Sequence, residues 1–173
     1  MTATAMRAGI MAIALALTLG SGLWSTGVAG EGLQQSSLRA TNDSGQPSDV
    51  SSEWMAAEGE ARVVARQGNQ DVIEFEARNL VPNGLYTVWW VNKGTLGMDM
   101  GPGGGSPDNE FKADANGNAT AKIEVPSNNA YQMMVVAYHA DNRTHGNSPG
   151  EMGETTFNHL MGPWPGPAGE TAG

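Results

Sequence analysis

The three histidines of this chain, His139, His145 and His159, lie within one stretch of 21 residues near the C-terminus. None occurs earlier in the sequence. Imidazole is the commonest metal ligand in proteins and the usual proton carrier near neutral pH. We therefore expect any chemistry of this protein to take place in that stretch.

Two methionines, Met152 and Met161, accompany the histidines. Copper and zinc both accept imidazole, and Cu(I) also accepts thioether sulfur. The histidines and these methionines are thus a candidate metal site, for copper with one Met ligand or for zinc with an open position. The histidine spacings of six and fourteen residues match no standard metal motif. The alternative interpretation is that the histidines hold the C-terminal loop by hydrogen bonds to the backbone.

Other chemistries find less support in the residues. The chain has no cysteine, which excludes a cupredoxin centre, a cysteine nucleophile and an iron–sulfur cluster. Gly146-Asn147-Ser148-Pro149-Gly150 has the Gly-x-Ser-x-Gly spacing, but no helical stripe follows it to form a nucleophile elbow, so a hydrolytic enzyme is only the third interpretation. Asp114-x-Asn116-Gly117-Asn118 resembles the start of a calcium loop, but Val125 stands where the bidentate Glu is required. We expect a plain hairpin turn there.

The N-terminus predicts export. Residues 1–30 have the pattern of a signal peptide, with one charge at Arg7, an apolar run over 10–19 and small residues up to Gly30. That run is shorter than the roughly 20 residues of a membrane-spanning helix. We expect a periplasmic or secreted protein without a transmembrane segment after cleavage. Residues 31–53, poor in large apolar groups, are expected to be a flexible linker, residues 54–164 a single domain and residues 165–173 a disordered tail.

The expected mature chain is strongly acidic. Loss of residues 1–30 removes Arg7 and no acidic residue, which leaves 8 Lys and Arg against 18 Asp and Glu, a net charge of −10. Such a charge repels nucleic acid, so we expect no nucleic-acid partner. A metal ion, or a protein or glycan of the cell envelope, remains as the expected partner.

The domain has the period-two pattern of β-strands. Residues 61–66 and 73–78 alternate apolar and charged residues around Gly68-Asn69, which predicts an antiparallel hairpin. Residues 85–91 predict a strand covered on both faces, with Trp89 and Trp90 on opposite sides. Further strands are expected at residues 119–125 and 131–139, and a long loop over residues 94–107. Without a helical stripe, this pattern predicts an all-β fold, an antiparallel β-sandwich of immunoglobulin-like topology or a similar small barrel.

Two segments carry a resemblance. Residues 80–90, which contain Tyr86-Thr87-Val88-Trp89-Trp90, and residues 138–150, which begin Tyr138-His139-Ala140-Asp141, resemble a group of exported bacterial all-β domain proteins. The resemblance covers roughly residues 55–163. It implies export and an all-β fold, and it carries over no catalytic residue.

Together these observations favour an exported β-domain that binds rather than catalyses, with copper or zinc as its ligand. The competing interpretation is a structural or interaction module of the cell envelope that holds no metal. The two interpretations differ on one point of geometry. Ligands to one metal each lie near 2 Å from it, so three imidazoles that share a metal must lie within about 5 Å of one another.

Overall fold

The computed structural model describes residues 34–41, 51–95 and 97–166. The expected signal peptide of residues 1–30 lies outside this part, as does most of the expected tail. The described part contains one short helix, α1 (Ser52–Met55), and nine strands. The strands are β1 (Gln35–Ala40), β2 (Glu58–Gln67), β3 (Gln70–Arg78), β4 (Leu85–Gly94), β5 (Gly97–Pro102), β6 (Glu110–Lys112), β7 (Ala119–Pro126), β8 (Met133–His139) and β9 (Thr156–Pro163).

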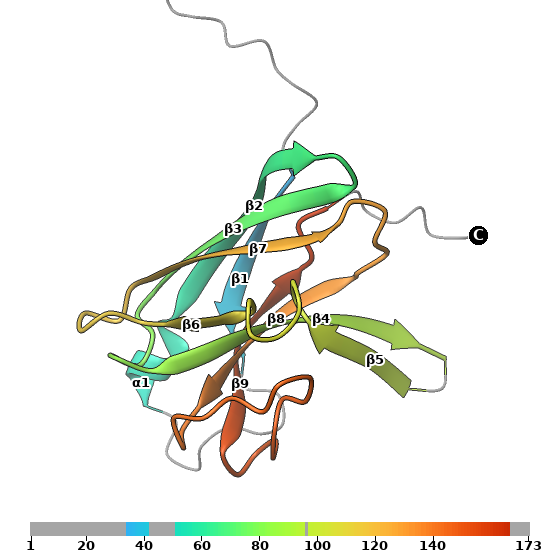
Figure 1. The fold of residues 1–173 in the computed structure, drawn as a ribbon. Coiled ribbons are helices and arrows are strands. Elements are labelled where there is room, and N and C mark those ends of the chain that lie inside the picture. The colour runs from blue at the N-terminus through green and yellow to red at the C-terminus, as the bar shows by residue number, and fades with distance from the viewer. Residues whose placement is uncertain (1–33, 42–50, 96, 167–173) are drawn as a thin grey trace, which may run out of the picture. The chain divides into compact units, whose positions relative to one another are not determined.

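The nine strands form one antiparallel sheet in the order β5-β4-β8-β9-β1-β2-β3-β7, with β6 also paired to β4. This sheet curls into a half-barrel, and the predicted all-β fold is confirmed (Figure 1). The hairpin expected at Asp114 is a correction: the turn joins β6 to β7, but these strands pair with different neighbours, β4 and β3. The Asp114 carboxylate accepts hydrogen bonds from the backbone N–H of Asn116 and Asn118, as expected for a turn.

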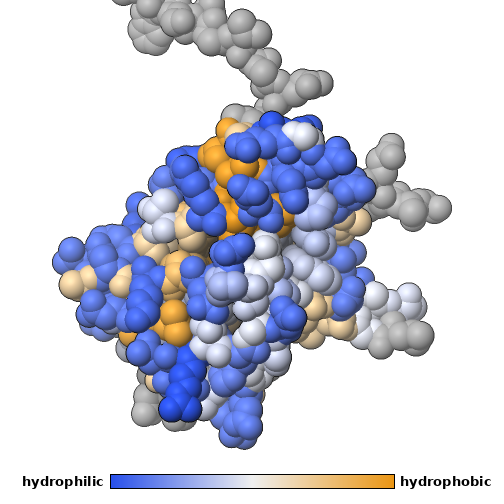
Figure 2. All heavy atoms as spheres, viewed as in Figure 1, coloured by the Kyte–Doolittle hydropathy of each residue, from blue (hydrophilic) through white to orange (hydrophobic). Residues whose placement is uncertain are grey.

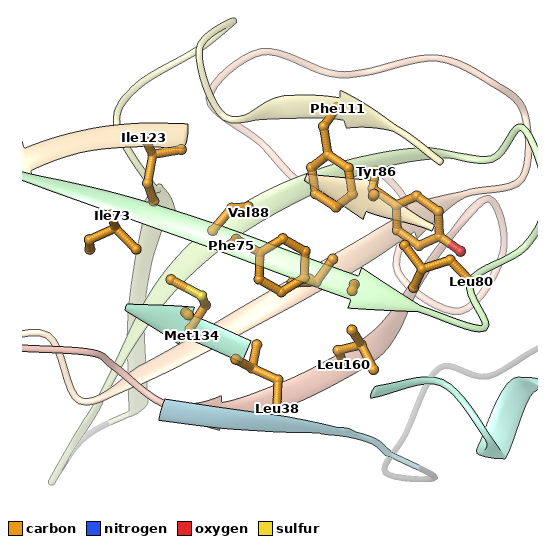
Figure 3. Packing of buried hydrophobic residues seen from close by; sticks show 14 of the residues in the cluster. Leu38, Ile73, Phe75, Leu80, Tyr86, Val88, Phe111, Ile123, Met134 and Leu160 are labelled. Carbon is orange, nitrogen blue, oxygen red and sulfur yellow. The ribbon is translucent and has the colours of Figure 1, made fainter. Parts of the chain in front are cut away.

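The main core lies on the inner, concave face of the sheet, where strands from both halves meet. Phe75 of β3, Phe111 of β6 and Met134 of β8 are all buried in it, and they point toward the same interior in Figure 3. The alternation predicted for the hairpin of β2 and β3 supplies part of this core, because Ile73 and Phe75 face inward while the intervening acidic residue stays at the surface.

A smaller apolar cluster lies on the opposite, outer face of the same sheet. Trp89, Val91, Val135 and Ala137 form it. Trp90 belongs to the inner face, where its ring stacks on Tyr131 at a centroid distance of 4.6 Å. The prediction that Trp89 and Trp90 face opposite sides is confirmed. On β8 the outer-face residues Val135 and Ala137 lead to His139, the last residue of the strand.

The structure corrects two expectations about irregular segments. Residues 35–40, expected within a flexible linker, form β1 between β2 and β9, with Leu38 fully buried in the core. The sequence of β1 lacks the apolar alternation of a strand because its other buried residue, Ser36, is polar. The Ser36 hydroxyl donates a hydrogen bond to the Pro163 carbonyl. Residues 97–102, expected within a loop, form the edge strand β5, which pairs with β4 alone. Its glycines suit an edge that packs tightly, since a Cβ at Gly101 would lie 2.6 Å from the Trp90 ring.

The outward side of β2 and β3 carries cross-strand ion pairs. Arg62 binds Glu74 and Glu76 at 2.5 and 2.8 Å, and Lys122 adds to Glu74 at 3.2 Å. Hydrophilic residues dominate the face of the molecule shown in Figure 2. Within the described residues, no helix has the length and hydropathy needed to cross a membrane.

Candidate metal centre

The candidate metal centre forms where β8 ends. His139 is the last residue of β8, and its side chain lies on the outer face, next to the cluster of Trp89 and Val135. It is only 1% exposed. Both ring nitrogens have partners, since Nε2 lies 2.8 Å from Thr87 Oγ1 on β4 and Nδ1 lies 3.3 Å from Thr156 Oγ1 on β9. The sheet therefore fixes the orientation of this imidazole.

The loop between β8 and β9, seen at the bottom of Figure 1, brings a carboxylate and a second imidazole close to His139. Asp141 begins a turn in which its carboxylate accepts the backbone N–H of Arg143 at 3.1 Å. Asn142 takes a left-handed φ of 58° and donates its N–H to the His139 carbonyl. This reversal directs the following residues back over β8, so that the His145 ring comes to 6.0 Å from that of His139.

Gly150 makes room for the His145 ring. A Cβ at this position would lie 2.5 Å from His145 Cδ2 and 2.9 Å from Thr156 Oγ1. The Gly150 φ of 88° is also one that other residues rarely adopt. Glycine is thus required here both for backbone conformation and for the approach of His145 to the sheet.

The resulting cluster brings three potential metal ligands together. One ligand atom each from His139, Asp141 and His145 lies within 4.8 Å of the others, and His145 Nε2 is 3.6 Å from Asp141 Oδ2. A metal about 2.0–2.2 Å from each ligand holds any two of them at most about 4.4 Å apart. Only a linear arrangement reaches that limit. Tetrahedral coordination holds two ligands about 3.4 Å apart, so the most widely spaced pair must close by more than an ångström. We call these three residues the His–Asp cluster.

The electrostatics of the cluster favour a neutral His139. Burial lowers the pKa of His139, and the neighbouring His145 lowers it further. Asp141 and Glu110, on β6 opposite Thr87, act in the other direction. Neutral imidazole is the form that binds metals. His139 is thus available as a ligand at neutral pH, while Asp141 supplies a negative charge at the surface.

The two nitrogens of His139 are not equivalent. Nε2 is held closely by Thr87, whose Oγ1 also accepts the Trp89 Nε1–H at 2.7 Å. Nδ1 has only the longer contact with Thr156. Metal-bound histidines usually anchor their second nitrogen in this way, which fixes both tautomer and ring orientation. Nδ1 is therefore the nitrogen that could hold a metal, with Thr87 and Trp89 supporting the ring through Nε2.

His159, the third predicted ligand, does not join the cluster. Val136 pairs with Leu160, but the next residue of β8, Ala137, pairs with Asn158, so His159 is an extra residue in β9. Regular alternation from Met161 would place His159 on the outer face with His139. The bulge instead turns it to the inner face beside Leu160.

On the inner face His159 has a structural role. Its ring stacks on Trp54 of α1 at 3.6 Å, and its Nε2 donates to the Trp54 carbonyl at 2.9 Å. Nδ1 therefore accepts the Tyr86 hydroxyl proton at 3.2 Å, while that hydroxyl accepts the Val81 N–H. Burial lowers the pKa of His159 to about 4. This histidine joins α1 to the sheet as a neutral ring.

The two methionines predicted as ligands, Met152 and Met161, do not belong to the His–Asp cluster either. Met152 is 40% exposed and forms an isolated bridge with Thr156, so it lies beside the cluster. Met161 packs against the outer-face apolar cluster, opposite Val135. The third member of the cluster is Asp141, which was not among the ligands predicted from the sequence. The His-x-Asp-x-x-x-His spacing at a strand end was the available signal.

No protein-family model matches this chain, and no significant match was found among curated proteins or solved structures. The resemblance to exported bacterial β-domain proteins therefore stays a prediction.

Proposed function

We propose that this protein binds a divalent transition-metal ion through His139, Asp141 and His145. The observation that carries the proposal is the convergence of two imidazoles and one carboxylate within 4.8 Å. These side chains come from a rigid strand end and from a loop folded back upon it. A surface cluster formed by chance has less reason to include a buried, oriented imidazole.

The ligand types favour Zn(II) or Cu(II). The carboxylate replaces the thioether expected from the sequence, which shifts the preference from Cu(I) toward borderline divalent ions. Three protein ligands leave at least one coordination position open. Asp141 and His145 are exposed, so that position faces solvent and an exchangeable ion, water or partner group has access to it.

Calorimetric titration of Zn(II) into protein purified without a histidine tag tests the proposal. We expect one ion per chain, and loss of that binding in His145→Ala, which removes an exposed side chain that lies against Asp141 and His139. His159→Phe is the matched control, because it removes the imidazole that the bulge turns away from the site. If both variants bind as the wild type does, or if neither the wild type nor any variant binds, the proposal fails.

We also propose that the protein is exported, which is supported by the signal-peptide pattern of residues 1–30. Such a location exposes the site to metal ions that the cytoplasm buffers. Mass spectrometry of the protein recovered from the periplasm or medium tests this directly. We expect a chain that begins near residue 30 or 31, whereas an intact N-terminus in the cytoplasmic fraction would overturn it.

A further inference from the structure

Methionine is over-represented where this protein exposes apolar side chains. Among the described residues, the large hydrophobic side chains that are exposed are all methionines: Met55, Met98, Met100 and Met152. No leucine, isoleucine, phenylalanine or tryptophan of the described part is exposed to that degree. A general demand for surface hydrophobicity does not select one side chain in this way, which directs attention to the thioether itself.

The register of the sheet gathers four methionines on the outer face. Met100 of β5 pairs with Val91 of β4, and Val91 pairs on its other side with Met133 of β8. Met98 lies two residues from Met100 along β5, so it shares that face. Met161 of β9 is a diagonal neighbour of Met133 and, like it, packs against the outer-face cluster. We call these four residues the methionine face.

The spacing allows their sulfur atoms to meet. Met98 and Met100 are about 7 Å apart along the strand, and Met100 and Met133 are two strand spacings, about 10 Å, apart. Methionine has three rotatable side-chain bonds and reaches over the smaller Val91 between them. Asp99 points to the other face by alternation. Lys93, opposite Met98, is exposed, and its long stem lets the ammonium group remain in solvent.

Packing alone accounts for only part of this arrangement. Met133 and Met161 are partly buried and cover Val91 and Val135, as any large apolar residue would. Met98, at 71% exposed, covers little, and Met100 is 37% exposed. Thioethers are soft ligands that select Cu(I) over hard and borderline ions. The exposed pair beside a partly buried third thioether is therefore suited to a soft monovalent ion.

We propose that Met98, Met100 and Met133 form a second metal site, specific for Cu(I), on the outer face of the sheet. Met133 is six residues from His139 along β8, so this site lies about 20 Å from the His–Asp cluster. The two sites share one face and differ in ligand softness. The proposal does not depend on the His–Asp cluster binding a metal.

The test uses Ag(I), a redox-inert probe of Cu(I) sites, in chloride-free buffer with ¹³C-methyl-methionine-labelled protein. We expect the methyl resonances of Met98, Met100 and Met133 to shift at one equivalent of Ag(I), while those of Met55 and the core residue Met134 do not. The Met98→Leu/Met100→Leu variant keeps the side-chain volume and should fold normally. Its Ag(I) affinity should fall at least tenfold, whereas Met55→Leu should match the wild type.

The outcomes separate this proposal from the previous one. Retained Zn(II) binding and lost Ag(I) binding in the double leucine variant would support a distinct thioether site. Unchanged Ag(I) affinity in that variant, or shifts confined to Met152 beside the His–Asp cluster, would overturn it. The His145→Ala variant should lose Zn(II) and keep the Ag(I)-induced shifts on the methionine face.

Discussion

The buried His159 makes the stability of this protein depend on pH in a defined window. Its pKa of about 4 lies below the ordinary value of 6.5. Between these two values the unfolded chain binds a proton that the folded chain does not, so stability falls as the pH is lowered from 6.5 to 4 and is fully present above 6.5. A difference of about 2.5 units corresponds to about 3 kcal/mol.

His159→Phe isolates this contribution. Phenylalanine keeps a ring on Trp54 but removes the titration and the acceptor of the Tyr86 hydroxyl proton. We expect the variant to be less stable than the wild type by about 1 to 3 kcal/mol at pH 7, because a buried donor loses its partner. At pH 4 the wild type has lost about 3 kcal/mol through His159, so the difference should vanish or reverse.

Urea unfolding followed by tryptophan fluorescence, in EDTA at pH 7, 5.5 and 4, measures this difference. Titration of the carboxylates and of His139 occurs in both proteins and cancels in the comparison. A wild-type minus variant difference that stays constant from pH 7 to pH 4 would refute the reasoning. So would a His159 pKa near 6.5 measured by NMR.

Three further substitutions test the site and the fold. Thr87→Val removes the hydroxyl that anchors His139 Nε2 at 2.8 Å, and we expect Zn(II) affinity by calorimetry to fall about 10- to 100-fold; an unchanged affinity would contradict the assigned support. Gly150→Ala forces a Cβ to 2.5 Å from His145 and should weaken Zn(II) binding, whereas Gly146→Ala, also at positive φ but with nothing within 4 Å, should only lower the melting temperature. Leu38→Ala should cost about 2–5 kcal/mol in urea unfolding, because Leu38 is fully buried in β1; a cost near zero would fit a linker there instead.

The sequence predicted the fold well where alternation is regular. A Gly-Asn turn joins β2 to β3, and the buried residues of β3 occupy every second position. β2 departs from this regularity by a register shift between Val63 and Ala65. Alternation did not predict β1, because polar and small residues flank Leu38 in the sequence. The burial of Leu38 comes instead from the pairing of β1 with β2 and β9 in the curled sheet. Alternation also did not predict β5, since glycine-rich sequence is typical of loops and the Trp90 ring that requires Gly101 lies on another strand.

The candidate site was predicted in part, for a physical reason. His139 and His145 converge because a strand end and a turn are local features, visible in the sequence. His159 diverges because one extra residue in β9 reverses the side-chain direction, and nothing in the local sequence reports a bulge set by pairing with β8. Asp141 was missed because a carboxylate in a polar loop is as typical of a solvated surface as of a metal site.

The most direct test of the central claim is a ¹⁵N NMR experiment on the imidazole nitrogens during titration with Zn(II). We predict that the resonances of His139 Nδ1 and of one His145 nitrogen shift with a stoichiometry of one ion per chain, while the resonances of both His159 nitrogens do not shift. If the His159 resonances shifted together with those of His139 and His145, the bulge in β9 would not keep His159 out of the site. Unchanged spectra for His139 and His145 at excess Zn(II) would mean that the His–Asp cluster is not a metal site.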